Sequence, residues 1–206
     1  GALLGDRMRM TNADSSDLVF IRSLATRNHP GGLMDCLTPM VDILSECGWD
    51  NILIETVGAG QSEIRVVAFA DRILLVDGPD RGDIIQAEKA GIMELADLIV
   101  INKSDLPEAE RAAKAVKSAL SVAEDEFTPE VLLVSAHSGV GVEELVDELE
   151  NTTTSSERER LRVRERLISA WDSALLTSPE LDDILQALEK GSITLLDAVD
   201  SIRKDG

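Results

Sequence analysis

The sequence has few cysteines and no long apolar run. Its two cysteines, Cys36 and Cys47, have no partner histidine and no Cys-x-x-Cys spacing, so neither a disulfide framework nor a zinc site is indicated. We expect both thiols to be reduced packing residues of a cytoplasmic protein. No apolar run approaches the roughly 20 residues that span a bilayer, and no signal peptide is visible. The 206 residues suffice for one α/β domain with an appendage.

Basic residues are also scarce. The chain has 39 acidic and 20 basic residues, which gives a net charge of −19. Strong binding to nucleic acid or to an anionic membrane depends on neutralising phosphates with Lys and Arg. We therefore expect neither partner, whereas a nucleotide that brings its own magnesium remains compatible.

A third absence concerns one dipeptide. No Gly-Lys occurs anywhere, so the phosphate-gripping loop Gly-x-x-x-x-Gly-Lys-Ser/Thr is missing from these residues. The chain also begins at Gly1 without Met. Gly1 is either an expression scar or the start of a segment cut from something longer.

Short apolar runs alternate with helical stretches in the first three quarters of the chain. Such runs predict buried parallel strands with helices on both faces of the sheet. The expected strands are Val19–Ile21, Ile52–Ile54, Ile73–Val76, Leu98–Ile101 and Val131–Val134, and the expected helices are Leu33–Cys47, Gly82–Ala96, Ala109–Val122 and Val142–Glu150.

The last quarter has a different character. Asn151–Ser156 is a polar linker, and an Arg-rich helical stretch follows through Arg166 and becomes amphipathic through Leu176. Further helices are expected over Leu181–Leu188 and Thr194–Ile202. We predict a domain over residues 1–150 and a helical arm over 151–206, for which a simple cap on the sheet is the alternative.

The chemistry starts at Asn102-Lys-Ser-Asp105, which follows an apolar strand. The Asp105 carboxylate can accept two parallel hydrogen bonds from the ring N–H and the amino group of guanine, which adenine cannot offer. Asn102 would tie neighbouring loops together, and the stem of Lys103 would lie along the base. After the strand that ends at Val134, a backbone N–H of Ser135-Ala136 could meet the guanine carbonyl oxygen. The plainer alternative for Asp105 is a helix N-cap.

A second acid ends another predicted strand. Glu55 is followed by Thr-Val-Gly58, where an acid can hold a magnesium shell and a glycine lets its backbone N–H approach a terminal phosphate. The alternative for Glu55 is a buried acid that caps the next turn. Gln61 lies three positions after Gly58, and no role is assigned to it. His137 is expected to be a solvated loop residue.

Together these residues resemble the MeaB/ArgK family of GTPases, which includes the methylmalonic aciduria type A proteins and was formerly described as LAO/AO transport system kinases. The motifs that carry the resemblance are Leu4-Gly-Asp-Arg-Met-Arg-Met10, Phe20-Ile-Arg-Ser23 with Arg27 and Gly31-Gly32, Glu55-Thr-Val-Gly-Ala-Gly-Gln-Ser-Glu63, Gly82-Asp83 with Gln86, Lys89 and Gly91, and Asn102-Lys-Ser-Asp105. The string Glu55 to Glu63 is the most specific of them. The stretch from Ser178 through Ile202 resembles the family's C-terminal dimerisation arm.

The resemblance implies a P-loop NTPase-like α/β fold and a GTP-hydrolysing chaperone of a cobalamin-dependent mutase, of the methylmalonyl-CoA mutase type, that uses GTP/GDP and Mg. It also implies a homodimer. By position, Asp6 and Glu55 resemble the family's magnesium-linked acids, and Gly58 its phosphate-sensing glycine. The stretch that contains Asp83, Gln86 and Lys89 resembles a switch that reports the nucleotide state to the mutase.

In that family the phosphate loop, its strand and its helix precede the Leu4-Gly-Asp6 segment. The resemblance implies that the missing strand is central and lies between the strands that end at Glu55 and Asp77. Its absence would leave unpaired backbone edges. We therefore predict either direct pairing of those two strands or strand exchange with a second copy.

Two functional interpretations follow. The chain is either a truncated form of a complete GTPase, which would bind GTP poorly and be inactive alone, or a natural non-catalytic dimerising module. A flavodoxin-like domain would have no reason to combine Glu55-Thr-Val-Gly58 with Asn-Lys-x-Asp.

Overall fold

A computed structural model describes residues 19–22, 34–56, 69–79, 92–93, 95–121 and 128–204. The chain divides into two compact units, one of residues 53–168 and one that combines residues 1–52 with 169–206. The first unit contains the sheet, and each unit is described by itself below.

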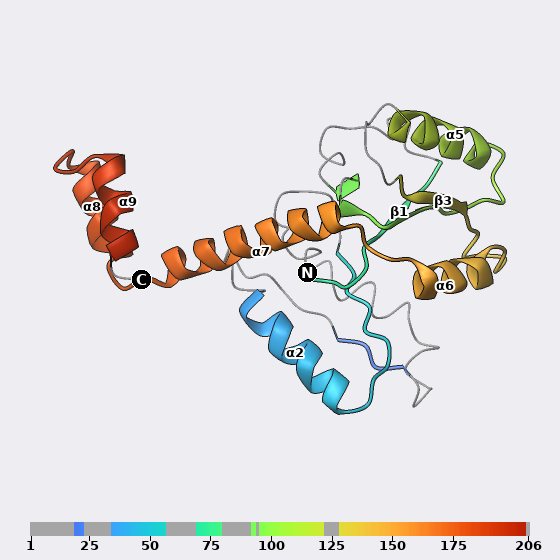
Figure 1. Cartoon of the computed structure of the whole chain (residues 1–206), viewed down its shortest axis with the longest axis horizontal. Coiled ribbons are helices and arrows are strands. Elements are labelled where there is room, and N and C mark those ends of the chain that lie inside the picture. The colour runs from blue at the N-terminus through green and yellow to red at the C-terminus, as the bar shows by residue number, and fades with distance from the viewer. Residues whose placement is uncertain are drawn as a thin grey trace. The chain divides into compact units, whose positions relative to one another are not determined.

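The sheet has three parallel strands in the order β1-β2-β3 (Figure 1). They are β1 (Leu74–Asp77), β2 (Leu98–Ile101) and β3 (Glu130–Leu133). All four residues of the middle strand are buried, as a strand covered on both faces requires. This confirms the α/β class, the parallel direction and three predicted strands to within one residue.

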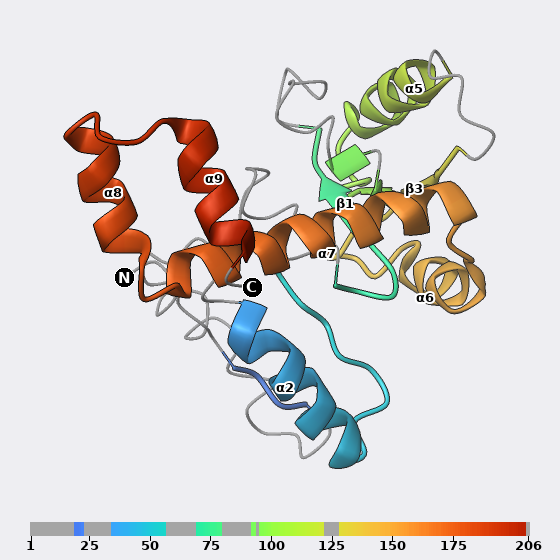
Figure 2. The same cartoon turned by 60° about the vertical axis from the view of Figure 1, so that its left-hand side comes forward.

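Helices cover both faces of this sheet, and Figures 1 and 2 show α5 (Ala109–Leu120) and α6 (Val142–Asn151) on opposite sides of it. Side chains alternate along β2, because successive residues of a strand point to opposite faces. Ile99 and Ile101 join the cluster that includes α5, whereas Leu98 and Val100 join the one that includes Leu145 of α6. The continuous apolar runs seen in the sequence are thus explained by two-sided burial.

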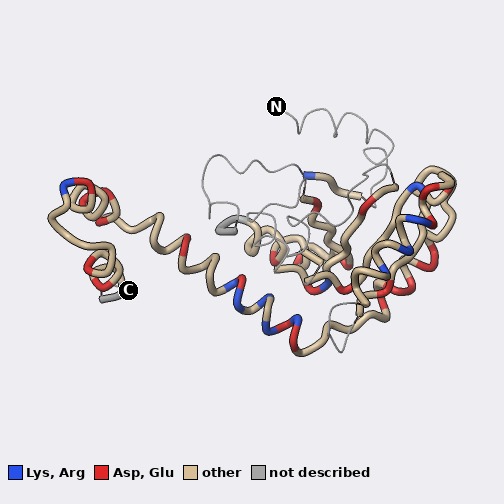
Figure 3. The backbone as a smooth tube through the Cα atoms, turned by 90° about the horizontal axis from the view of Figure 1, so that it is seen from above, with Lys and Arg blue, Asp and Glu red and all other residues tan. Residues whose placement is uncertain are grey.

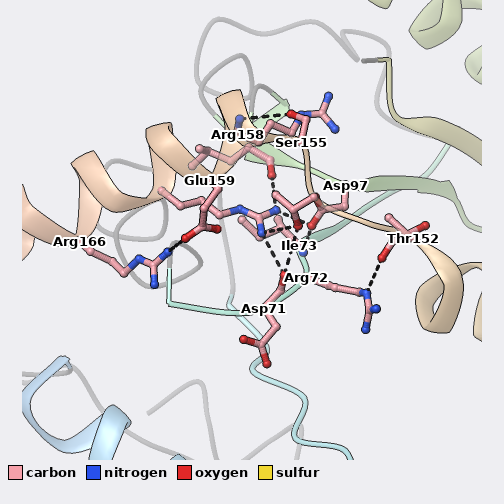
Figure 4. Close-up of polar contacts among 12 residues, drawn as sticks. Asp71, Arg72, Ile73, Asp97, Thr152, Ser155, Arg158, Glu159 and Arg166 are labelled. Carbon is pink, nitrogen blue, oxygen red and sulfur yellow. Dashed lines mark hydrogen bonds and ion pairs between the residues drawn. The ribbon is translucent and has the colours of Figure 1, made fainter. Parts of the chain in front are cut away.

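The helix α7 (Ser156–Thr177) begins in the sheet unit, and Leu161 packs against the α5 side of the core. The segment before it, predicted as a polar linker, is tied to the start of β1. Arg72 donates from Nε to the Thr152 carbonyl at 2.9 Å (Figure 4). It also donates from Nη2 to the Glu150 carbonyl at 3.1 Å. The compact sheet unit therefore extends through the first half of α7.

The buried guanidinium group of Arg162 anchors the first half of α7 to the sheet. The side chains of Arg162 and Asp97 are each 1% exposed and form an ion pair. Arg162 also donates to the carbonyl oxygens of Asp71 and Leu95, each at 3.0 Å, while Asp97 accepts from the backbone N–H of Ile73 at 2.8 Å. One side chain thus joins α7 to the amino ends of β1 and β2, the opposite end of the sheet from Asn102.

The other unit is helical where it is described. It contains α2 (Met34–Glu46), α8 (Leu181–Glu189), α9 (Leu195–Lys204) and the second half of α7. The start of α9 is capped reciprocally, because Thr194 Oγ1 donates to Asp197 Oδ2 at 2.7 Å and accepts from the Asp197 backbone N–H at 3.2 Å. None of the helices in the described ranges is long and apolar enough to cross a membrane.

Two predicted strands are wrong. Residues 19–21 and 52–54 are described and have no regular secondary structure, and Leu53 is 91% exposed. Direct pairing between the Glu55 segment and β1 is likewise not formed among the described residues. A strand needs a neighbour to satisfy its backbone N–H and C=O groups, and a local apolar run does not supply one. Most of the helix predicted over 82–96 lies outside the described residues, although positions 92, 93 and 95 are helical.

Candidate functional site

The carboxyl ends of β2 and β3 bring two predicted segments together. The Asn102 backbone N–H donates to the Asp77 carbonyl at 2.7 Å, and the Ser104 N–H donates to the Val134 carbonyl at 3.0 Å. These bonds continue the parallel sheet by one step beyond β2. The loop 102–105 is therefore fixed beside the loop that follows β3.

Asn102 links these two loops through its side chain. Its Oδ1 accepts from the Lys103 backbone N–H at 2.7 Å and from the Ala136 backbone N–H at 3.1 Å. The sequence predicts that a backbone N–H of Ser135 or Ala136 meets a guanine carbonyl, whereas here the Ala136 N–H donates to Asn102 and the Ser135 N–H donates to the Val140 carbonyl at 2.9 Å.

Lys103 has a left-handed backbone with φ of +61°. This conformation costs a residue other than glycine about 1–2 kcal/mol and occurs preferentially at functional sites. The Asn102 side chain stabilises it by accepting the Lys103 N–H. The turn therefore holds the loop in a shape that its residues would not adopt alone.

Asp105 is exposed, and its carboxylate is oriented by the loop after β3. The Ser135 hydroxyl, whose residue is 1% exposed, donates to Asp105 Oδ1 at 2.6 Å. This hydrogen bond, with the Asp105 backbone N–H and the charges of His137 and Lys103, lowers the pKa of Asp105 below its ordinary value. The carboxylate is therefore ionised at neutral pH. It retains acceptor capacity beyond Ser135, because a carboxylate has about four lone-pair sites.

These side chains surround a pocket of about 380 Å³, which is lined by Asn102, Lys103, Asp105, Leu106, Ala136 and His137. Its volume and its convergent polar groups suit a small planar ligand. An ionised acceptor beside a lysine and a leucine can bind a flat, hydrogen-bonding base. Two lining residues, Leu106 and His137, were not assigned to the site from the sequence. Both residues directly follow a predicted site residue in the sequence, Asp105 or Ala136, and this adjacency could have assigned them to the site.

Glycine is required at the base of the second loop. Gly141 has φ of +77°, and a Cβ on it would lie 2.5 Å from the Leu133 carbonyl oxygen. The chain after Ser135 can therefore return close to β3 before α6 begins. This close approach supports the loop that carries Ser135 and Ala136.

The remaining predicted site residues are not part of this pocket. Glu55 is exposed in a segment without regular structure and does not line it. Asp6, Gly58, Gln61, Asp83, Gln86 and Lys89 lie outside the described residues. Within the described ranges, no group of three or more His, Cys, Asp or Glu side chains could hold a metal ion. Of the two acids predicted for magnesium, only Glu55 lies in the described ranges, so the structure does not test that pair.

Comparison with known proteins identifies the family. A sequence model described as methylmalonyl Co-A mutase-associated GTPase MeaB matches residues 1–181. A Pyrococcus abyssi protein with GTPase in its name is 35% identical over 224 residues, which cover 100% of this chain and 69% of that protein. GTPase ArgK of Escherichia coli is 36% identical over 70% of this chain and 46% of its own length.

Two further comparisons agree with these. The mouse protein named methylmalonic aciduria type A homolog, mitochondrial, is 38% identical over 71% of this chain, and the match covers 37% of the mouse protein. A crystal structure of a LAO/AO transport system kinase superposes with a TM-score of 0.65 and covers 95% of this chain and 68% of the other. At 23% identity this match shows the shared fold. The chain therefore belongs to the MeaB family of methylmalonyl-CoA mutase-associated GTPases.

Proposed function

We propose that the pocket around Asp105 recognises the base of GTP and GDP. The observation that carries the proposal is the ionised Asp105 carboxylate, oriented by Ser135, at the mouth of a parallel sheet beside Asn102 and Lys103. Guanine offers two adjacent N–H donors to such an acceptor, and adenine does not. A site built to accept two hydrogen bonds discriminates strongly, because the wrong base leaves the acceptor unsatisfied.

The wider function that we propose is that of a GTPase which acts in the cytoplasm as a homodimeric chaperone of a cobalamin-dependent mutase of the methylmalonyl-CoA mutase type. Family membership supports this proposal. Within it we assign Asp6 and Glu55 to the magnesium shell, Gly58 to the terminal phosphate, and Asp83, Gln86 and Lys89 to the mutase contact. Bound Mg would neutralise charge on the nucleotide phosphates.

For the 206 residues alone, we propose base recognition without efficient hydrolysis. No Gly-Lys dipeptide is present to grip the β- and γ-phosphates, and this grip normally supplies much of the affinity for a nucleotide triphosphate. The same absence favours a second candidate, a non-catalytic dimerising module derived from this family. The two candidates differ in whether guanine is still recognised.

Titration of the ¹⁵N-labelled chain with GDP, and separately with ADP, tests base recognition. We expect GDP to shift the amide signals of Asn102, Lys103 and Ala136 in a saturable way, and ADP to leave them unchanged at the same concentration. Asp105→Ala should abolish the GDP response, while the exposed helix variant Glu110→Ala should keep it. Equal responses to GDP and ADP, or none to either, would favour the module.

A further inference from the structure

The base site proposed above still needs a donor for one group of guanine. The edge of this base carries two donors, the ring N–H and the amino group, and one acceptor, the 6-carbonyl oxygen. Asp105 can accept from both donors. The two backbone N–H groups expected to meet the oxygen are already used, because Ser135 donates to the Val140 carbonyl at 2.9 Å. Ala136 likewise donates to Asn102 at 3.1 Å. Another group must therefore replace the hydrogen bond that the carbonyl oxygen makes with water.

The imidazole ring of His137 is placed to supply this donor. His137 is exposed and lines the pocket together with Asp105, so its ring can reach a ligand there. An imidazole has one N–H donor when it is neutral and two when it is charged. Two other lining side chains also carry N–H donors. Asn102 is held between the two loops by its bonds, and the stem of Lys103 would lie along the face of the base, away from its edge.

The serine that orients Asp105 also fixes the turn that carries His137. Ser135 Oγ accepts the Ser138 backbone N–H at 3.2 Å, and the Ser135 carbonyl accepts the Gly139 backbone N–H at 2.8 Å. His137 lies within this turn, which is anchored in the core because Ser135 is 1% exposed. The pKa of Asp105 is lowered first by the Ser135 hydroxyl and also by the charge of His137, so the imidazole and the carboxylate lie close together.

The charges around His137 are mostly negative. From the other loop, Asp105 and Lys103 line the same pocket. On its own side, Glu143 and Glu144 of α6 line a neighbouring hollow. Acidic positions recur along the helices that flank the sheet (Figure 3), in a chain of net charge −19. A charged imidazole offers a cation to this acidic surface, and a charged donor forms a stronger hydrogen bond than a neutral one.

We propose that His137 is a specificity-determining residue, whose imidazole donates a ring N–H to the 6-carbonyl oxygen of guanine. Asp105 and His137 then match all three groups on the edge of the base. Adenine has an amino group in place of this carbonyl, so it would meet the imidazole with a second donor. The charged imidazole binds the oxygen more strongly, so the contribution of His137 increases as a histidine gains its proton. This inference rests on the base recognition proposed above and adds a second residue to it.

A double-mutant cycle between the side chain and the base tests the contact by calorimetry. The nucleotide 6-thio-GDP keeps the ring N–H and the amino group of guanine but has sulfur, a weak acceptor, in place of the carbonyl oxygen. We expect the wild-type chain to bind GDP about tenfold more tightly than 6-thio-GDP at about pH 6.5. His137→Ala should bind the two nucleotides within about twofold of each other. The matched control is Val140→Ala, which truncates a side chain 63% exposed on the same loop and should keep the wild-type preference.

The pH dependence gives a readout that a merely structural role of His137 would not give. His137→Gln retains an N–H donor but cannot gain a proton. We expect the ratio of the GDP affinities of the wild-type chain and His137→Gln to rise at least about threefold between about pH 8 and about pH 6, as a histidine becomes charged. Titration of the nucleotide phosphates affects both proteins alike, so it cancels in this ratio.

The outcomes separate this inference from the proposal on which it rests. A wild-type chain that does not bind GDP overturns both the base recognition and the role of His137. A His137→Ala variant that still prefers GDP to 6-thio-GDP assigns the carbonyl oxygen to a backbone N–H and overturns the role of His137 alone. An equal loss of preference in Val140→Ala, or an affinity ratio that does not rise as the pH falls, also overturns this role and leaves the base recognition by Asp105 intact.

Discussion

One hydroxyl group sets the state of the carboxylate on which the site depends. The Ser135 hydroxyl is the largest cause of the lowered pKa of Asp105, ahead of the backbone N–H and of the charges of His137 and Lys103. The bond favours the ionised carboxylate, which is the form that accepts two hydrogen bonds from guanine. Ser135 is therefore a positioning residue for the pocket.

We predict that Ser135→Ala raises the pKa of Asp105 toward the ordinary value of about 3.9. Because the pKa of Asp105 is lowered in the folded state, the stability that this contact contributes is present above the unfolded pKa. It is lost as the pH falls through the folded pKa. A ¹³C NMR titration of the Asp105 carboxyl group measures the change. An unchanged pKa in the variant would contradict the role given to Ser135.

The sequence predicted the meeting of Asn102, Asp105 and Ala136, because the carboxyl ends of parallel strands share one edge of a sheet. It did not predict that Asn102 would occupy the Ala136 N–H, since a side-chain bond between loops depends on their exact approach. Nor did it indicate the burial of Arg162. A run of alternating Arg and Glu is typical of a solvated helix, and only the packing of the chain selects which arginine is inside.

At the scale of the elements, the sequence predicted strands correctly where a neighbouring strand pairs with them, and wrongly where none does among the described residues. The run Leu98–Ile101 is a strand because β1 and β3 satisfy its backbone on both sides. The run Ile52–Ile54 has similar composition and is irregular. Apolar composition is a local property, whereas the hydrogen bonds of a strand come from a distant segment. The helices were predicted more closely, since their backbone bonds are local.

The buried ion pair between Arg162 of α7 and Asp97 gives a prediction at the scale of one element. Arg162→Ala should destabilise the protein by about 3–5 kcal/mol, because it leaves the Asp97 carboxylate buried without its partner. The matched variant Arg166→Ala removes an arginine from the same helix, but its pair with Glu159 is solvent-exposed, with side chains 37% and 51% accessible. Arg166→Ala should therefore lower the free energy of unfolding by only about 0–1 kcal/mol. Urea unfolding curves measure both.

Comparing the two variants identifies the cause of any loss of stability. Equal destabilisation by both substitutions would indicate a general effect of losing an arginine from α7. It would contradict a specific role for the buried pair. In that case the contacts of Arg162 with Asp71, Leu95 and Asp97 would not be what anchors the first half of α7.

The loop before α6 allows a second comparison. Gly139 and Gly141 both have positive φ, at +81° and +77°, but only Gly141 approaches the Leu133 carbonyl. We expect Gly139→Ala to cost about 1–2 kcal/mol for the backbone conformation. Gly141→Ala should cost about 1–3 kcal/mol more, because of the clash. Thermal unfolding gives both values, and equal costs would mean that the close approach is relieved by movement of the loop.

At the scale of the whole molecule, the proposed base site and the residues that would grip phosphates are separate matters. The described residues include the pocket around Asp105 for which we propose base recognition, while a Gly-Lys dipeptide of the kind that grips phosphates does not occur in these 206 residues. We therefore predict that GMP, GDP and GTP bind this chain within about tenfold of one another. Calorimetry with the three nucleotides tests this. Much tighter, magnesium-dependent binding of GTP would show that phosphate capture is supplied by other residues.

The central claim is that the Asp105 carboxylate reads the edge of guanine, and a base exchange tests it most directly. Xanthine has a carbonyl group where guanine has its amino group, so it repels a carboxylate but can accept from an amide. We predict that the wild-type chain binds GDP at least about tenfold more tightly than XDP, and that Asp105→Asn reverses this preference. A wild-type chain that does not distinguish GDP from XDP, or an Asp105→Asn variant that still prefers GDP, would contradict the account.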